Sequence, residues 1–154
     1  MKTFVDIFDT HFRGIHERSC QLAALIPHDR LFWKPPTGES YSCGEYLLRS
    51  AAAVEQAFGG ITVRLWDDPF EWTLPEELST HDKISKYLGE VEATRIKGFG
   101  YFESDTDLTR RIPAPEILTP IFTILLDTIA RASHFQGRAF AVFQMFSTLK
   151  LPPI

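Results

Sequence analysis

The stretch TPIFTILLDTIARASHFQGRAFAVFQMFSTL, residues 119–149, decides the fold. Its apolar and small residues recur at alternating steps of four and three, which is the pattern of a helix that buries one face along its whole length. The positions are Ile121, Leu125, Thr128, Ala132, Phe135, Ala139, Val142, Phe146 and Leu149. Pro120 suits a first helical turn, and Pro152-Pro153 prevents the helix from continuing. The sequence therefore predicts a long helix that packs against its neighbours at a shallow angle.

Three further stretches, residues 3–26, 42–58 and 80–99, also show helical spacing. Their apolar faces carry Phe8, Phe12, Ile15, Leu22 and Leu25 in the first, Cys43, Leu47, Ala51, Val54 and Phe58 in the second, and Ile84, Tyr87, Leu88, Val91 and Phe99 in the third. Four such helices predict an all-α four-helix bundle that forms a single domain over residues 1–154. Ligand and metal sites of such bundles lie in the core, between facing helices.

The boundaries of the second helix have local signals. Ser42 and Glu45 have the spacing of a capping box, and Gly59-Gly60 is expected to end the helix. Long stretches without helical spacing, residues 59–79 and 101–118, join the helices. Connections of this length predict crossovers rather than a simple series of hairpins.

The first of these connections is rich in aromatic residues. Ile61, Val63 and Leu65 alternate with polar residues, which would allow a short extended segment. Trp66, Phe70 and Trp72 follow. One interpretation is a loop that lays its aromatic rings over the bundle. The alternative is a lid or a contact between two copies of the chain.

Composition excludes several classes of protein. The chain has 16 Lys and Arg against 20 Asp and Glu, a net charge of −4, and no basic cluster, which argues against binding to nucleic acid. No apolar run reaches the ~18 residues of a membrane span, and the first residues do not resemble a signal peptide. Cys20 and Cys43 are too few for a disulfide framework, and we expect both to pack as small apolar groups in a reduced, cytoplasmic protein.

Four segments together resemble the DinB-like family, also called the YfiT-like putative metalloenzymes. They are LFWKP at 31–35, SCGEYLLR at 42–49, HFQGR at 134–138 and LPP at 151–153. The resemblance implies a four-helix bundle, often a homodimer. It also implies a divalent metal bound by three histidines, one on the second helix and two on the fourth. Some members of that family are thiol-dependent transferases or isomerases.

This chain departs from the family at all three metal positions. The histidine of the second helix corresponds to Arg49, and the pair on the fourth helix corresponds to Arg131 and Phe135. Arginine stays protonated and offers no lone pair, and phenylalanine has no donor atom. We therefore expect neither a metal nor another cofactor. A site built from unusual ligands could draw on Asp127, His134 and Glu45, if they converge, and on the other histidines.

Two interpretations of Arg49 and Arg131 remain open. Glu45 precedes Arg49 by four residues and Asp127 precedes Arg131 by four, so each arginine has a carboxylate at the spacing of a helical ion pair. Alternatively, both guanidinium groups line a central pocket with Phe135 and bind a small anionic molecule.

The remaining candidate for chemistry is His134, which is either a general base beside two arginines or an ordinary surface residue. The sequence thus favours a binding protein that has lost the metal site over an enzyme. One alternative is a metal- or thiol-dependent transferase or hydrolase with non-standard ligands. The other is a structural or partner-binding dimeric bundle.

Overall fold

The computed structural model describes residues 1–38, 41–72 and 79–154, with the backbone alone at 71 and 72. Its four long helices are α1 (Thr3–Leu25), α2 (Cys43–Val63), α5 (His81–Phe99) and α6 (Ile121–Phe146). The shorter elements are η1 (His28–Arg30), α3 (Pro69–Trp72), η2 (Asp105–Thr109), β1 (Arg111–Pro113) and β2 (Leu118–Pro120). The predicted helices are confirmed to within a few residues, except at the end of α2.

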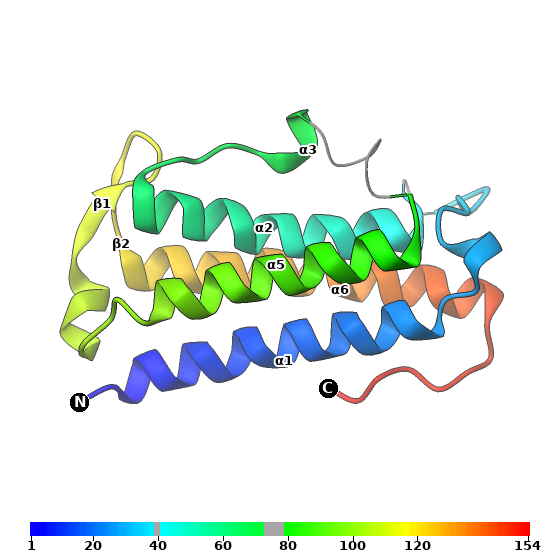
Figure 1. Ribbon diagram of the computed structural model, residues 1–154, viewed down its shortest axis with the longest axis horizontal. Coiled ribbons are helices and arrows are strands. Elements are labelled where there is room, and N and C mark those ends of the chain that lie inside the picture. Colours follow the sequence, from blue (N-terminus) through cyan, green and yellow to red (C-terminus); the bar gives the residue numbers. More distant parts are fainter. Residues whose placement is uncertain (39–40, 73–78) are drawn as a thin grey trace.

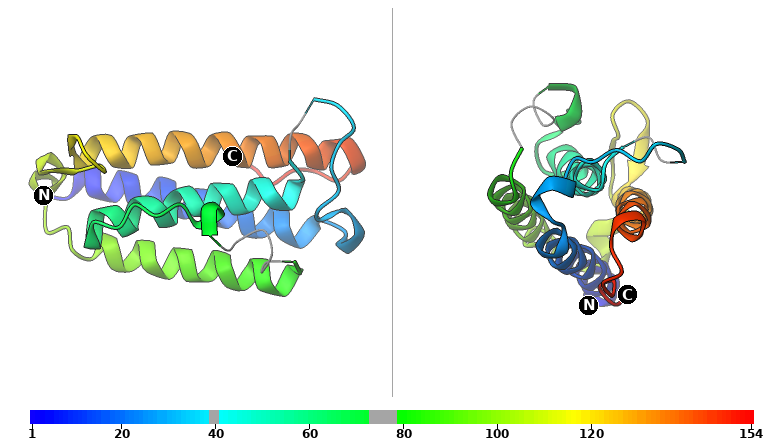
Figure 2. Two further views of the ribbon diagram at one scale, coloured as in Figure 1. Left: turned by 90° about the horizontal axis from the view of Figure 1, so that it is seen from above. Right: turned by 90° about the vertical axis from the view of Figure 1, so that its right-hand side faces the viewer.

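The four long helices surround one core (Figures 1 and 2). Helices α1 and α6 run in one direction, whereas α2 and α5 run in the other. After α2 the chain returns along the outside of that helix over residues 64–72, so the described part of this connection has the path of the predicted crossover (Figure 1). The second connection instead turns around one end of the bundle. It carries the antiparallel pair β1–β2, which the prediction of an all-α chain missed.

Helix α2 continues through Gly59-Gly60 and ends only at Arg64, whose φ of 61° closes the helix. The predicted end at Gly59 and the extended segment from Ile61 are therefore wrong. A Cβ atom at Gly59 would lie 2.7 Å from the carbonyl oxygen of Leu65, and one at Gly60 would lie 2.3 Å from the ring of Trp66. The glycine pair allows the chain to fold back tightly against its own helix.

Helices α2 and α6 form the most extensive contact in the bundle. The Ser50 hydroxyl donates to the carbonyl of Ala132 at 2.8 Å, and the Cys43 thiol donates to the carbonyl of Ala139 at 3.3 Å. Both pairs are buried, and they lie seven residues apart on each helix. They fix the register of the two helices, because sliding one past the other would leave buried donors without acceptors.

Among the described residues, one charged side chain is fully buried. The guanidinium of Arg95 on α5 is 2% exposed and binds Glu92 through two hydrogen bonds, of 2.6 and 3.0 Å, and Asp9 on α1. Burial raises the pKa of Asp9, but hydrogen bonds from Arg95 and Arg13 outweigh this effect, so the pKa of Asp9 lies below its usual value. The ion pair between α5 and α1 thus satisfies a charge that would otherwise be costly to bury.

The start of α1 is held by a residue a hundred positions away. The backbone N–H groups of Phe4 and Val5 donate to the carboxylate of Asp105, at 2.9 and 3.0 Å. The N–H of Asp105 in turn donates to the carbonyl of Met1 at 2.8 Å. Asp105 therefore caps α1 from the second connection, because Lys2 makes no side-chain cap.

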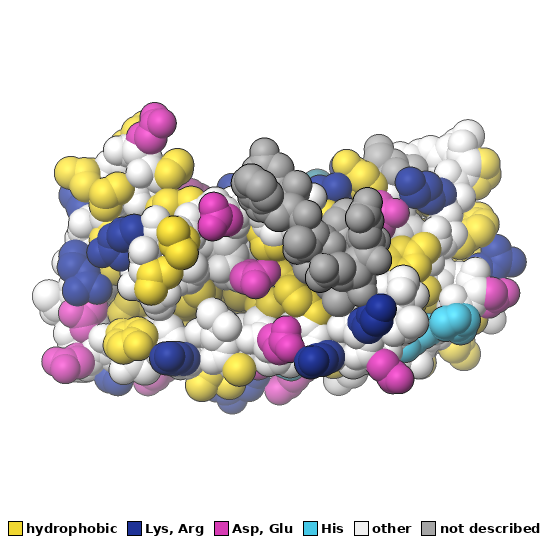
Figure 3. All heavy atoms as spheres, turned by 45° about the horizontal axis from the view of Figure 1, so that its top comes forward, with side chains coloured by type: hydrophobic (Ala, Val, Ile, Leu, Met, Phe, Trp, Pro, Cys, Tyr) yellow, Lys and Arg dark blue, Asp and Glu magenta, His cyan; other side chains and the backbone are white. Residues whose placement is uncertain are grey.

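The surface is mixed in charge. On the face drawn in Figure 3, basic and acidic side chains of the described residues are interspersed. None of the helices in the described part of the chain has the length and apolar character needed to cross a membrane.

Arg95→Met should lower the free energy of unfolding by about 3 kcal/mol, because it leaves Asp9 and Glu92 without their shared cation. Arg13 binds the same Asp9 carboxylate at 2.8 Å, but its side chain is 54% exposed. Arg13→Met should therefore cost about 0.5 kcal/mol or less. Urea denaturation of both variants measures the difference. Equal losses in the two variants would contradict the structural role given to Arg95.

Candidate functional site

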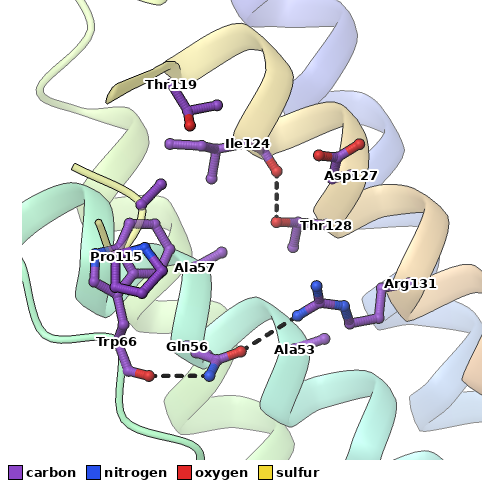
Figure 4. A pocket seen from close by; sticks show the side chains of 11 residues that line it. Ala53, Gln56, Ala57, Trp66, Pro115, Thr119, Ile124, Asp127, Thr128 and Arg131 are labelled. Atoms are coloured by element: carbon purple, nitrogen blue, oxygen red, sulfur yellow. Dashed lines mark hydrogen bonds between the residues drawn. The ribbon is translucent and has the colours of Figure 1, made fainter. Parts of the chain in front are cut away.

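A groove runs along the outer side of α2 and α6 and holds two adjoining cavities. The larger, about 310 Å³, lies between the two helices, Trp66 of the crossover and the turn of the β1–β2 hairpin (Figure 4). The smaller, about 150 Å³, lies closer to the start of α2 and is bounded by Asp68 and Phe70 of the crossover. Ala53, Gln56 and Arg131 line both. The two cavities therefore form one continuous site.

Arg49 of α2 lies at the end of the smaller cavity. Its guanidinium carbon is 4.0 Å from the ring centre of Tyr41 and 4.4 Å from that of Phe70, so aromatic rings pack against the cation. Its Nε atom is buried and has no hydrogen-bond acceptor among the described residues. The expected ion pair with Glu45 is not formed, because the Glu45 carboxylate lies 3.9 Å from Lys34 instead.

Arg131 of α6 separates the two cavities. Its guanidinium donates to the side-chain oxygen of Gln56 on α2 at 3.3 Å, and the Gln56 amide donates to the carbonyl of Trp66 at 3.0 Å (Figure 4). The expected ion pair with Asp127 is also not formed. In the described part of the chain, neither Arg49 nor Arg131 has a carboxylate within ion-pair distance.

The structure brings together most of the residues that the sequence singled out. Arg49, Arg131 and Phe135 line the smaller cavity, and Asp127 lines the larger one. Glu45 lines neither. The sequence analysis expects this pocket in the bundle core, whereas both cavities are bounded by crossover or hairpin residues outside the cluster of buried apolar side chains. A position at the surface lets the two guanidinium groups keep contact with water.

His134 lies outside this site. Its exposed ring accepts a hydrogen bond at Nε2 from the Nε of Arg138, at 3.0 Å, and it lines neither cavity. The lone pair that a general base would use is thus occupied by a cation on the same helix.

Cys20 is exposed on α1 rather than packed in the core, whereas Cys43 is buried as expected. The Cys20 sulfur lies 3.5 Å from Nε2 of His16, which is the kind of neighbour a nucleophilic thiol needs. However, burial and the charges of Glu92 and Glu17 raise the pKa of Cys20. This environment favours the unreactive thiol over the thiolate.

The positions that correspond to the metal ligands of the resembled family do not fit a divalent metal. Two arginines and a phenylalanine offer no lone pair to a cation. Within the described residues, no three His, Cys, Asp or Glu side chains are grouped closely enough to hold a metal ion.

No signal in the sequence assigned several residues to the site, although Trp66 and Phe70 pack against the bundle as one interpretation of the aromatic connection expects. Trp66 lies over Gly60 and donates from its indole nitrogen to the carbonyl of Pro113 at 3.0 Å, which ties the crossover to the hairpin. Gln56 connects this wall to Arg131. The Gly59-Gly60 pair is the available sign that something packs closely on α2, but a glycine pair is also typical of a helix end. Tyr41 and Phe70 stand out only by being aromatic.

Comparison of the chain with protein-family models, with curated proteins and with solved structures finds no match.

Gly60→Ala should displace the Trp66 ring and lower the free energy of unfolding by about 1–3 kcal/mol, because the new methyl group overlaps the indole. Gly89 is an exposed glycine of α5 with no neighbour within 4 Å of an added Cβ, so Gly89→Ala should instead be stabilising by up to about 1 kcal/mol. Thermal unfolding gives both values, and the indole N–H resonance of Trp66 reports the displacement. An unmoved resonance in Gly60→Ala would show that the ring does not need this glycine.

Proposed function

We propose that this protein binds a small anionic molecule in the groove between α2 and α6, with Arg49 and Arg131 as its main contacts. The observation that carries the proposal is that two arginines line one cavity of about 150 Å³ while neither has a carboxylate partner in the described part of the chain. Unpaired arginines at the wall of one concave site favour an anion as its occupant.

The packing around Arg49 favours a planar anion such as a carboxylate. Aromatic rings pack against the guanidinium of Arg49. A ligand can therefore reach the N–H donors only along the edge of the guanidinium plane. The buried Nε atom of Arg49 has no acceptor, which costs free energy. A small movement of the side chain toward an oxygen of a bound ligand would remove that cost. A carboxylate or phosphate matches the paired donors of such an edge.

Asp68 reduces the positive charge of the smaller cavity but does not cancel it, because one carboxylate lines the cavity with two guanidinium groups. It lines that cavity, but its carboxylate accepts the backbone N–H of Phe70 at 2.9 Å and so holds the first turn of α3. This hydrogen bond positions the Phe70 ring, which packs against Arg49. Asp68 thus supports the cation site structurally.

Arg49→Gln and Arg131→Gln should each weaken the binding of a small dicarboxylate by about tenfold or more, because each removes a charged donor. The probes are succinate, malonate and inorganic phosphate, followed by calorimetry at low ionic strength. Arg110→Gln removes the same charge from an exposed connection and should leave binding unchanged. The proposal fails if none of the probes binds, or if Arg110→Gln weakens binding as much as the other two variants.

We also infer that the chain is a DinB-like protein whose metal site has been replaced. Two observations support this: the four-helix bundle with a long crossover, and the meeting of Arg49, Arg131 and Phe135 at one cavity. The resemblance assigned these three positions to metal ligands, which must converge on one point. The homodimer that the resemblance implies stays a prediction.

Arg49→His, Arg131→His and Phe135→His, introduced together, should create a site that binds one zinc or nickel ion per chain, because three histidines would then face one cavity. Plasma mass spectrometry of protein purified with each metal supplied gives the stoichiometry. The matched control places the third histidine at Gly137, an exposed position of α6 outside the cavity, in place of Phe135. Equal metal content in the control and the triple variant would remove this support for the family.

A further inference from the structure

The larger cavity differs in charge from the smaller one. Its own polar groups, apart from Arg131 and Gln56 at the boundary, are Thr119, Asp127 and Thr128. The Thr128 hydroxyl donates to the carbonyl of Ile124 at 2.6 Å, so its oxygen remains able to accept. All three side chains therefore offer hydrogen-bond acceptors, and one of them carries a negative charge.

The charge of Asp127 is not neutralised within the described residues. Its side chain is exposed and makes no hydrogen bond or ion pair there, although Arg131 lies one helical turn away. Arg131 extends across the groove to Gln56 instead (Figure 4). The carboxylate thus borders the larger cavity with its acceptor oxygens unused.

The charges follow a fixed order along the groove. Because α2 and α6 are antiparallel, Arg49 lies at one end, Arg131 in the middle and Asp127 beyond it. Arg49 and Gln56 are seven residues apart on α2, about 10 Å, and Asp127 lies about 6 Å from Arg131 along α6. The smaller cavity, lined by two arginines and Asp68, is therefore more positive than the larger one, which Asp127 lines with a single arginine.

We propose that the ligand is an elongated zwitterion, an acid that also carries a protonated amine. This inference rests on the proposed function, because the anionic group takes the place already given to it at Arg49 and Arg131. The ammonium group lies in the larger cavity, with Asp127 as its counter-ion and the threonine hydroxyls as further acceptors. Between them, a short apolar chain passes over Ala53, Ala57 and Ile124.

The walls of the larger cavity suit an ammonium group with an apolar stem. The ring of Trp66 forms one side, and indole is the aromatic group that attracts cations most strongly. The alanines and Ile124 offer apolar contact to methylene groups. A second anion would instead meet the charge of Asp127 and be repelled, so the site distinguishes an amino acid of suitable length from a dicarboxylate of the same length.

The test compares three probes that share a six-carbon acid chain, 6-aminohexanoate, hexanoate and 6-acetamidohexanoate, by chemical-shift titration at low ionic strength. Wild-type protein should bind 6-aminohexanoate about threefold to fivefold more tightly than either uncharged-tail probe. Asp127→Asn should abolish that preference without weakening the binding of hexanoate. Asp29→Asn, an equal charge change at an exposed residue of η1, should leave the preference intact.

The outcomes separate this inference from the proposed function. If all three probes bind equally and Arg131→Gln weakens them all, the anion site stands and the zwitterion is overturned. The zwitterion is also overturned if Asp127→Asn keeps the preference. If no probe binds, or binding does not depend on Arg49 and Arg131, both proposals fall together. The acetylated probe removes the positive charge from the ligand, so the result does not depend on the folding of any variant.

Discussion

The close contact between α2 and α6 determines both the packing of the core and the composition of the groove. Two buried donors, Ser50 and Cys43, bind carbonyl groups of α6 one heptad apart, and alanines on both helices allow the approach. That register determines which residues meet on the outer side of the same pair. It places Arg131 opposite Gln56 and brings Arg49 into the cavity that Phe135 lines. The groove is thus a consequence of how the core is packed beneath it.

Much of the fold could be predicted because its signals are local. The alternating apolar steps gave the four helices, and the side chains of Ser42 and Thr80 cap α2 and α5 through bonds to residues three positions on. The errors involve contacts between distant segments. Gly59-Gly60 is typical of a helix end but here admits Trp66, and the cap of α1 comes from Asp105. The local sequence at each place does not identify the residue that makes the contact.

Four of the five residues expected at the pocket line one of the two cavities, whereas the helical ion pairs expected of its arginines are not formed. An ion pair between residues one turn apart on a helix contributes only about 0.2–0.5 kcal/mol. Other contacts of the same arginine can therefore replace it. At Arg49 the competitors are two aromatic rings, one of them Phe70 from the crossover, and at Arg131 it is the amide of Gln56. Phe70 is separated from Arg49 by the rest of α2, and helical spacing carries no information about it. The cations consequently face the groove rather than their expected partners.

Because the groove lies on the outer side of the bundle, the residues proposed to bind a ligand are not the ones that stabilise the fold. The helices are held together by the buried apolar side chains, by the buried donors Ser50 and Cys43, and by Arg95. Arg49, Arg131 and Asp127 lie outside the cluster of buried apolar side chains, so we expect their replacement to disturb the interior little. The same scaffold can therefore carry different binding surfaces over evolutionary time. It also suits the laboratory, where a library randomised at those positions would consist largely of folded proteins that differ in what they recognise.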